Sequence, residues 1–314
     1  QGGYRKTEFE QLGLELPVPR DYTAVPVEPT EEWIALRWID EEMAEDRAEE
    51  EGVPVSRIFA PELMVIWIDW VPDPVVTGDE EGGEEAEEQQ KPINSFERYM
   101  DRIWRYRGKP LYRLSAPEKL DDEDGNQVYE YSLSPRSGPP AWARVFRNGQ
   151  RSLVMLGRAS RADWGDQLKI WEKMAKKAEL TQPEALDLSK WERYYERRPE
   201  YVGAEYRIEV RSKLVRGWEA EDTERYIFVF STRDEPLLRA LKRKLEAIRD
   251  VYEELFPPEA PIEEVSTVRV CRDRDEYFQY GGPQGSGGYW NSQARELVFY
   301  DYKEDQERAE RDFK

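Results

Sequence analysis

Three aromatic residues near the end of the chain are the strongest candidates for a binding site. Tyr289 and Trp290 directly follow a glycine-rich segment, residues 281–288, and Tyr300 lies in the apolar run that comes next. Aromatic rings beside such a connection can line a groove for an extended peptide. We therefore expect a protein or peptide ligand at Tyr289, Trp290 and Tyr300. The alternative is that the glycine-rich segment serves only as a flexible connection.

The residues needed for most catalytic sites are missing from the sequence. There is no histidine, which is the commonest general base and metal ligand, so a serine nucleophile would also lack its usual base. The single cysteine, Cys271, follows a Val-Arg-Val strand pattern and is expected to be a buried thiol. The glycine-rich segment lacks the Gly-Lys-Ser/Thr ending of a phosphate-binding loop. We predict no catalytic, cofactor-binding or metal-binding residue in this chain. A pair of carboxylates that hydrolyses glycosides is an alternative, but the spacing singles out no pair.

The charge of the chain restricts its partners. The formal net charge is -20, and residues 79–88 contribute seven carboxylates. Residues 78–91 are therefore expected to form a solvated acidic loop, and their spacing does not match that of an EF-hand calcium loop. Because the sequence shows no basic stripe, we expect no binding to nucleic acid or to an anionic membrane surface.

Length and composition indicate a globular protein of about two domains. The 314 residues are 39% hydrophobic and 12% aromatic, and no apolar run approaches the roughly 20 residues needed to span a bilayer, so we expect no membrane insertion. The sequence begins at Gln1 without an initiator Met, which fits a mature protein left after removal of a signal peptide. This interpretation places the protein outside the cell or in the cell envelope. A start that does not correspond to a natural end is the alternative.

The first part of the chain reads as strands, helix, strands, helix. Strands are predicted at 10–19, 33–39, 63–71, 111–114, 128–133, 141–146 and 152–157, with a hairpin turn at Asn148-Gly149. Helices are predicted at 41–51, 96–104 and 164–178. This order predicts an α+β domain over residues 1–185, an antiparallel sheet with helices on one face.

A second domain is predicted from residue 201 to residue 314, after a connecting helix at 186–200. Strands are expected at 206–210 and 225–230, and a long helix begins after Asp234 and ends before Pro257. The stretch 267–301 reads as strand, helix, glycine-rich loop and strand.

Two resemblances accompany these patterns. The element order, together with Gly13, Pro17 and Tyr22, is similar to the small α+β domains of the PsbP and Mog1 type, which implies a binding or scaffold module. The second resemblance rests on residues in the second part of the chain: Val-Tyr-Glu-Glu-Leu-Phe-Pro at 251–257, Val-Arg-Val at 268–270, Tyr277, Tyr280, Gly-Gly-Tyr-Trp at 287–290 and Glu-Leu-Val-Phe-Tyr-Asp at 296–301. With these residues, the second part resembles the front half of a gluzincin-like metallopeptidase family of secreted bacterial proteins.

The gluzincin resemblance implies an incomplete α+β domain. In that family a strand at this position borders the cleft, and a zinc-binding helix with His-Glu-x-x-His follows it. Without histidine this chain cannot form that motif, so zinc is implied only if the natural protein continues beyond Lys314. We therefore expect a non-catalytic binding or assembly module of a secreted or cell-envelope protein of metallopeptidase ancestry. The alternatives are the front part of an active zinc peptidase and a self-assembling structural subunit, which would form a homo-oligomer.

Overall fold

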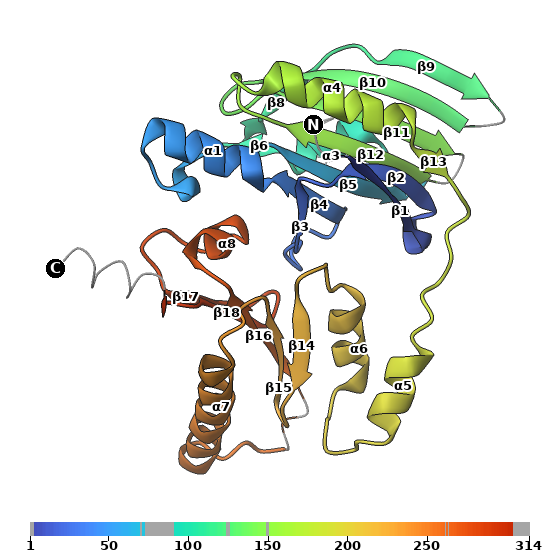
Figure 1. The fold of residues 1–314 in the computed structure, drawn as a ribbon. Coiled ribbons are helices and arrows are strands. Elements are labelled where there is room, and N and C mark those ends of the chain that lie inside the picture. The colour runs from blue at the N-terminus through green and yellow to red at the C-terminus, as the bar shows by residue number, and fades with distance from the viewer. Residues whose placement is uncertain are drawn as a thin grey trace, which may run out of the picture. The chain divides into compact units, whose positions relative to one another are not determined.

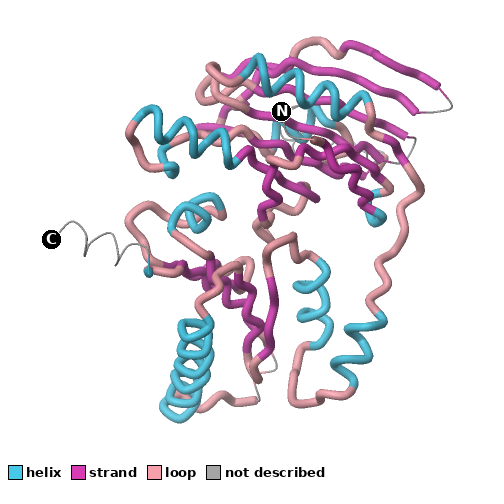
Figure 2. Tube along the Cα trace, viewed as in Figure 1, coloured by secondary structure: helices cyan, strands magenta, loops and turns pink. Residues whose placement is uncertain are grey.

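The chain divides into two compact units. The computed structural model describes residues 3–69, 71–72, 91–123, 126–148, 151–260, 262 and 264–303. Unit 1 comprises Gln1–Val25 and Glu31–Glu184, and unit 2 comprises Pro26–Thr30 and Ala185–Lys314. The predicted acidic loop at 78–91 falls, apart from Lys91, outside the described residues, as does Gly149 of the predicted hairpin turn. Each unit mixes helices with sheet, so the chain has an α+β fold (Figures 1 and 2).

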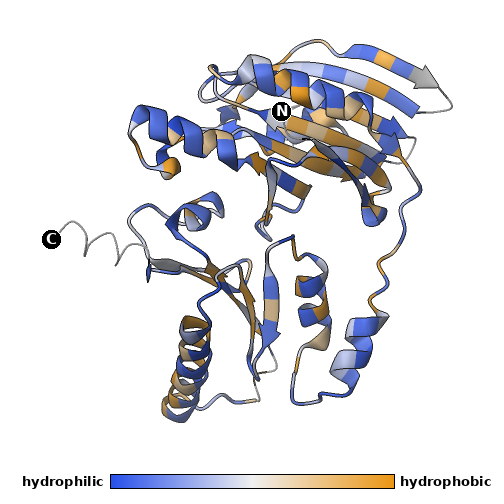
Figure 3. Cartoon of the chain, viewed as in Figure 1, coloured by the Kyte–Doolittle hydropathy of each residue, from blue (hydrophilic) through white to orange (hydrophobic). Residues whose placement is uncertain are grey.

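An antiparallel eight-stranded sheet forms the centre of unit 1. Its strands, in spatial order, are β3 (Tyr22–Val25), β4 (Ile34–Asp40), β5 (Glu62–Asp69), β12 (Arg151–Arg158), β11 (Ala141–Asn148), β10 (Asn126–Pro135) and β8 (Tyr112–Leu114), and β9 (Glu118–Glu123) also pairs with β10. The predicted pairing of the 141–146 and 152–157 strands is confirmed, because Phe146 lies opposite Leu153 and Asn148 opposite Arg151. Two largely apolar strands, β5 and β12, lie side by side in the middle of this sheet (Figure 3).

Smaller elements complete unit 1. The three-stranded sheet consists of β1 (Tyr4–Phe9), β2 (Leu14–Pro19) and β13 (Glu179–Leu180), and a two-stranded hairpin consists of β6 (Arg105–Tyr106) and β7 (Lys109–Pro110). The helices are α1 (Glu41–Glu51), α3 (Phe96–Arg102) and α4 (Trp164–Lys176), with short 3-10 turns at Glu10–Leu12 and Val55–Arg57. Asp40 and Ser95 begin α1 and α3 as side-chain caps, because each accepts a hydrogen bond from the backbone N–H three residues later.

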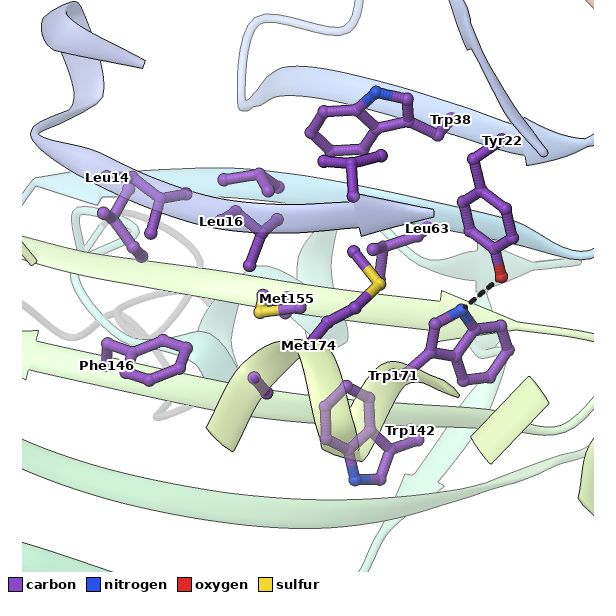
Figure 4. Packing of buried hydrophobic residues seen from close by; sticks show 14 of the residues in the cluster. Leu14, Leu16, Tyr22, Trp38, Leu63, Trp142, Phe146, Met155, Trp171 and Met174 are labelled. Atoms are coloured by element: carbon purple, nitrogen blue, oxygen red, sulfur yellow. Dashed lines mark hydrogen bonds between the residues drawn. The ribbon is translucent and has the colours of Figure 1, made fainter. Parts of the chain in front are cut away.

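Both faces of the large sheet are covered, which corrects the expectation of helices on one face. Successive residues of β5 alternate between two hydrophobic clusters, since side chains of a strand point to opposite faces. On one face, Leu63 packs with Leu16 of β2 and with Trp171 and Met174 of α4, and Trp171 Nε1 donates to the Tyr22 hydroxyl at 3.0 Å (Figure 4). On the other face, Met64, Ile66 and Ile68 pack against Phe96, Tyr99 and Met100 of α3.

Unit 2 contains a mixed five-stranded sheet. Its spatial order is β14 (Glu219–Asp222), β15 (Tyr226–Phe230), β16 (Ser266–Cys271), β18 (Glu296–Tyr300) and β17 (Gly288–Asn291). The three central strands are parallel to one another, and each end strand is antiparallel to its neighbour. The helices are α5 (Ser189–Glu196), α6 (Ala204–Ser212), α7 (Glu235–Leu255) and α8 (Arg274–Gln279). The predicted long helix is confirmed, with Asp234 as its cap and Pro236 in its first turn.

Two predictions for unit 2 are wrong at the level of single elements. Residues 206–210, predicted as a strand, belong to α6. Residues 206–210 alternate as in a strand, but Arg207 and Arg211 are four residues apart and therefore lie on one face of a helix. From that face both bind Asp222. In addition, the sequence analysis gave no strand between the glycine-rich loop and the last strand, whereas residues 288–291 form β17.

Candidate peptide-binding edge of the second unit

The three predicted site residues do not line one groove. Tyr289 lies opposite Val298 and Trp290 opposite Leu297, so the two neighbouring side chains point to opposite faces of the sheet. Tyr300 is only 6% exposed and belongs to the core cluster beneath Tyr289, whereas Trp290 is 52% exposed. The structure therefore brings Tyr289 and Tyr300 to one face and separates Trp290 from them. The prediction that all three contact one ligand is corrected, because one of them is core and the others diverge.

A cluster of tyrosines supports the strand that carries Tyr289. The Tyr277 ring lies 5.9 Å from the Tyr289 ring and 5.2 Å from the Tyr300 ring, and Tyr302 stacks on Tyr300 at 4.3 Å. The Tyr277 hydroxyl donates to Ser286 Oγ at 3.2 Å, which ties the helix α8 to the glycine-rich segment. A side chain at Gly282 would meet the Tyr277 ring at 2.2 Å, so the loop passes closely over this cluster. Packing of this kind fixes the position of β17.

The hydroxyl of Tyr289 is buried without a hydrogen-bond partner among the described residues. Burial raises its pKa above the ordinary value of 10.0, so the group stays protonated at neutral pH and remains a donor. An unsatisfied buried hydroxyl typically costs about 1–3 kcal/mol. The strand thus carries a donor that an added acceptor would stabilise.

The two ends of the five-stranded sheet differ in charge. The end strand β14 has the sequence Glu-Ala-Glu-Asp, and its exposed Glu221 pairs with Lys242. Charged side chains on an end strand protect it from pairing with further chains. The other end strand, β17, has the sequence Gly-Tyr-Trp-Asn, which carries no charge, and within the described residues its only paired neighbour is β18. Of these two ends, β17 is the one that can accept another strand.

The carboxylate nearest to β17 in the ladder is already fully engaged. Glu296 lies opposite Asn291 and is 1% exposed. It accepts a hydrogen bond from Arg269 Nε at 2.8 Å and another from the Tyr280 hydroxyl. The Arg269 guanidinium also lies over the rings of Tyr280 and Trp218, at 4.3 and 5.0 Å. This buried group joins β16 to β18 and supports the end strand.

The remaining titratable groups near the sheet are also structural. Cys271 is buried and its pKa is raised well above 9.0, chiefly by burial, so its thiol is not activated as a nucleophile. Burial likewise raises the pKa of Glu276, whose carboxylate accepts the Arg272 backbone N–H at 2.7 Å and the Ser231 hydroxyl. Among the described residues no group of three or more His, Cys, Asp or Glu side chains is arranged to hold a metal ion.

Sequence reasoning missed the residues that hold the edge in place. Tyr277 and Tyr280 were noted only as part of a resemblance, and Ser286 was not singled out. The sequence gives one usable signal: all five glycines of residues 281–288 lie between Tyr280 and Tyr289, and glycines next to tyrosines allow rings to pack closely against the backbone. The pairing of Arg269 with Glu296 has no local signal, because 27 residues separate the two partners.

Comparisons with known proteins give similarity to solved structures. No family model matches the chain, and no curated protein matches it. Among solved structures, the chain is similar to the solution structure of cyanobacterial PsbP (CyanoP) from Synechocystis sp. PCC 6803, at 14% identity, with a TM-score of 0.38, over 57% of this chain and 94% of that one. A score at this level carries no argument about function. In the part of the chain that the structure describes, no helix has the length and apolar character to cross a membrane.

Proposed function

We propose that the chain is a protein-binding module that captures an extended peptide along β17. The observation that carries the proposal is the uncharged end strand β17, which carries the exposed side chain of Trp290. A peptide added to a sheet edge gains backbone hydrogen bonds, and alternate side chains then give selectivity. Trp290 offers an apolar contact to one set of those side chains.

The proposal is tested with a designed peptide. The probe is Lys-Thr-Val-Tyr-Thr-Val-Lys, a β-prone sequence, and its control is the same peptide with every interior amide N-methylated, which blocks both edges of the strand. Both carry the same charge, so nonspecific attraction to this acidic chain is equal. We expect titration calorimetry to show binding of the first peptide and at least tenfold weaker binding of the second. Equal affinities would contradict the proposal, because N-methyl groups remove only the donors of the ladder.

A location outside the cell or in the cell envelope is part of the same proposal. It rests on the resemblance of the second part of the chain to a family of secreted bacterial proteins. Fractionation of the native host, followed by N-terminal sequencing of the mature protein, checks it. Recovery of the protein in the cytosolic fraction would contradict this location without affecting peptide binding.

Metallopeptidase ancestry rests on the sequence resemblance alone. The same is true of the alternative that the chain is the front part of an active zinc peptidase. The 314 residues contain no histidine, so they cannot hold zinc through His-Glu-x-x-His. Reading the gene beyond Lys314 decides this candidate. Absence of that motif within the following few dozen codons would end it.

Self-assembly is favoured by a separate observation on α7. Five apolar side chains of its last three turns are exposed: Ile248, Val251, Tyr252, Leu255 and Phe256. They continue the stripe formed by Leu241 and Leu245, which packs against the sheet. An apolar stripe of this size often marks a protein interface. Sedimentation at micromolar concentration tests the candidate: dimers that dissociate in Tyr252→Glu support it, and a monomeric wild type rejects it.

A further inference from the structure

Unit 1 carries a cationic surface, which corrects the expectation that the chain has no basic stripe. Residues 91–113 contain seven basic and two acidic residues, although the protein has a formal net charge of -20. The structure gathers the exposed members of this set on the β6–β7 hairpin and on β8. We call this surface the cationic hairpin and define it as Arg105, Tyr106, Arg107, Lys109, Arg113 and Arg136. Arg136 belongs to it because its backbone N–H donates to Leu111 O at 2.8 Å.

Most of these cations have no carboxylate partner. Arg105 pairs with Asp101 at 3.4 Å and also donates to Gly108 O. Arg107, Lys109, Arg113 and Arg136 are exposed and form no ion pair with any residue that the structure describes. Unpaired like charges held close together repel each other, so an anionic partner would stabilise the set.

Apolar surface lies within the same hairpin. Ile103 and Tyr106 are 48% and 53% exposed, and the Arg107 guanidinium lies 5.1 Å from the centre of the Tyr106 ring. Exposed aromatic and basic groups together are typical of interface residues that bind strongly. The expected ligand therefore combines negative charge with apolar side chains.

The hairpin turn holds Arg107 in an unfavourable backbone conformation. Arg107 and Gly108 form the two-residue connection, and both have positive φ, 51° and 76°. This geometry favours Asn-Gly, and a residue with a Cβ is strained there. An arginine at a position better suited to asparagine indicates that its charge has a use.

We infer that the cationic hairpin binds an acidic peptide segment of another protein, one that interleaves carboxylates with apolar residues. A long polyanion such as nucleic acid is a poorer partner, because it would extend beyond the patch onto the acidic remainder of the molecule. A short acidic segment avoids this repulsion, since charges are screened within about 8–10 Å at physiological salt. The inference concerns unit 1 and is independent of peptide capture by β17.

The experiment compares two triple variants of the full chain. The patch variant is Arg107→Asn with Lys109→Gln and Arg113→Gln. The control variant is Arg161→Gln with Lys176→Gln and Lys177→Gln, which removes three exposed cations elsewhere in unit 1. The probes are fluorescently labelled Glu-Glu-Leu-Glu-Glu-Leu-Glu-Glu and an oligo-dT of equal charge, measured by anisotropy at 0.15 M salt. The Asn-Gly turn of the patch variant is compatible with the hairpin, so its unfolding temperature should equal or exceed that of the wild type.

We expect the peptide to bind the patch variant roughly fivefold more weakly than the wild type, and the control variant within twofold of it. Tyr106→Ala should weaken the binding of the leucine-containing peptide and leave the binding of octaglutamate unchanged. Equal loss in both triple variants, or no measurable binding to the wild type, would overturn the inference. Tighter binding of oligo-dT than of the peptide would overturn the assigned partner class.

Discussion

The two units solve the problem of a buried core by different means. Unit 1 buries an antiparallel sheet between two apolar layers, and its fully buried side chains are mostly hydrophobic. Unit 2 places charged groups at the same depth: the side chains of Arg207 and Asp222 are 0% and 1% exposed. All five N–H donors of Arg207 are used, since it binds Asp222 and the carbonyls of Val202, Thr223, Glu224 and Tyr226. The contrast teaches that apolar packing defines unit 1, whereas polar pairing over distance defines unit 2.

The largest effect that tests this contrast is expected at Asp222. Asp222→Ala leaves Arg207 and Arg211 buried without their carboxylate, which typically destabilises a protein by about 3–5 kcal/mol. Denaturant unfolding followed by hydrogen exchange should show loss of protection in α6 and β14 while β12 keeps its protection. Glu246→Ala is the control: it breaks the half-buried pair with Arg225 and should cost about 1 kcal/mol or less. Equal losses for the two variants would contradict a polar core in unit 2.

A packing change should have the next largest effect, in unit 1. A Cβ at Gly157 would lie 2.5 Å from the Trp171 ring, which is itself fully buried. Gly157→Ala is therefore expected to destabilise unit 1 by about 1–3 kcal/mol through overpacking. Gly165→Ala in α4 meets no atom within 4 Å and should stabilise by about 0.5 kcal/mol through helix propensity. Thermal unfolding of both variants checks this pair, and a neutral Gly157→Ala would show that the core is loosely packed.

A smaller effect is expected from Asp40, a buried carboxyl of unit 1. Burial raises its pKa above the ordinary value of 3.8, although Gln167 and the Met43 backbone N–H donate to it. The folded state thus binds a proton that the unfolded chain has released. The contribution of Asp40 to the free energy of unfolding therefore falls as pH rises from 3.8 through the raised pKa, and it is constant above that pKa.

Asp40→Asn should flatten this part of the pH profile, because asparagine still caps α1 and carries no charge. Denaturant unfolding between pH 3.5 and 7 measures the slope. Asp166→Asn removes one exposed carboxylate from the same unit and should leave the slope unchanged. A profile for Asp40→Asn that matches the wild type would show that the carboxyl does not titrate differently on folding.

The smallest effect on stability is expected at Trp290. Because its side chain is half-exposed on an end strand, Trp290→Ala should change the unfolding free energy by less than about 0.5 kcal/mol. The same variant should weaken binding of the seven-residue peptide severalfold. A large loss of stability would mean that Trp290 supports the core instead of offering a contact surface.

The difference between the units also explains how well each could be predicted. In unit 1 the apolar runs at 63–71 and 152–157 predicted the central strands, because continuous apolar sequence marks strands buried on both faces. The same apolar runs indicate that both faces of the sheet are covered. The order of elements, from which helices on one face were predicted, does not show this. In unit 2 the cap at Asp234 and the stop near Pro257 predicted α7 closely. The α6 segment was misread because Arg207 owes its burial to Asp222, fifteen residues away, and local periodicity carries no trace of that pairing.

For the candidate site, the sequence drew attention to the segment that forms β17 but did not specify its geometry. Tyr289 and Trp290 were singled out as aromatic residues after a glycine-rich segment, and they do lie on the end strand of the sheet. Which of them faces the core depends on register with β18, which the sequence does not specify. The sequence did not show that Tyr300 is buried, because its burial depends on contacts with Tyr277 and Tyr302 in the folded unit. Tyr300 was therefore included in the predicted site.

Amide hydrogen exchange across residues 288–291, with and without the seven-residue peptide, tests the central claim most directly. If the peptide adds as a strand to β17, the outward-facing amides of this segment become protected on binding, while those of the charged end strand β14 stay unchanged. Binding that leaves residues 288–291 exchanging at their free rate, or that protects β14 or α7 instead, would contradict the account.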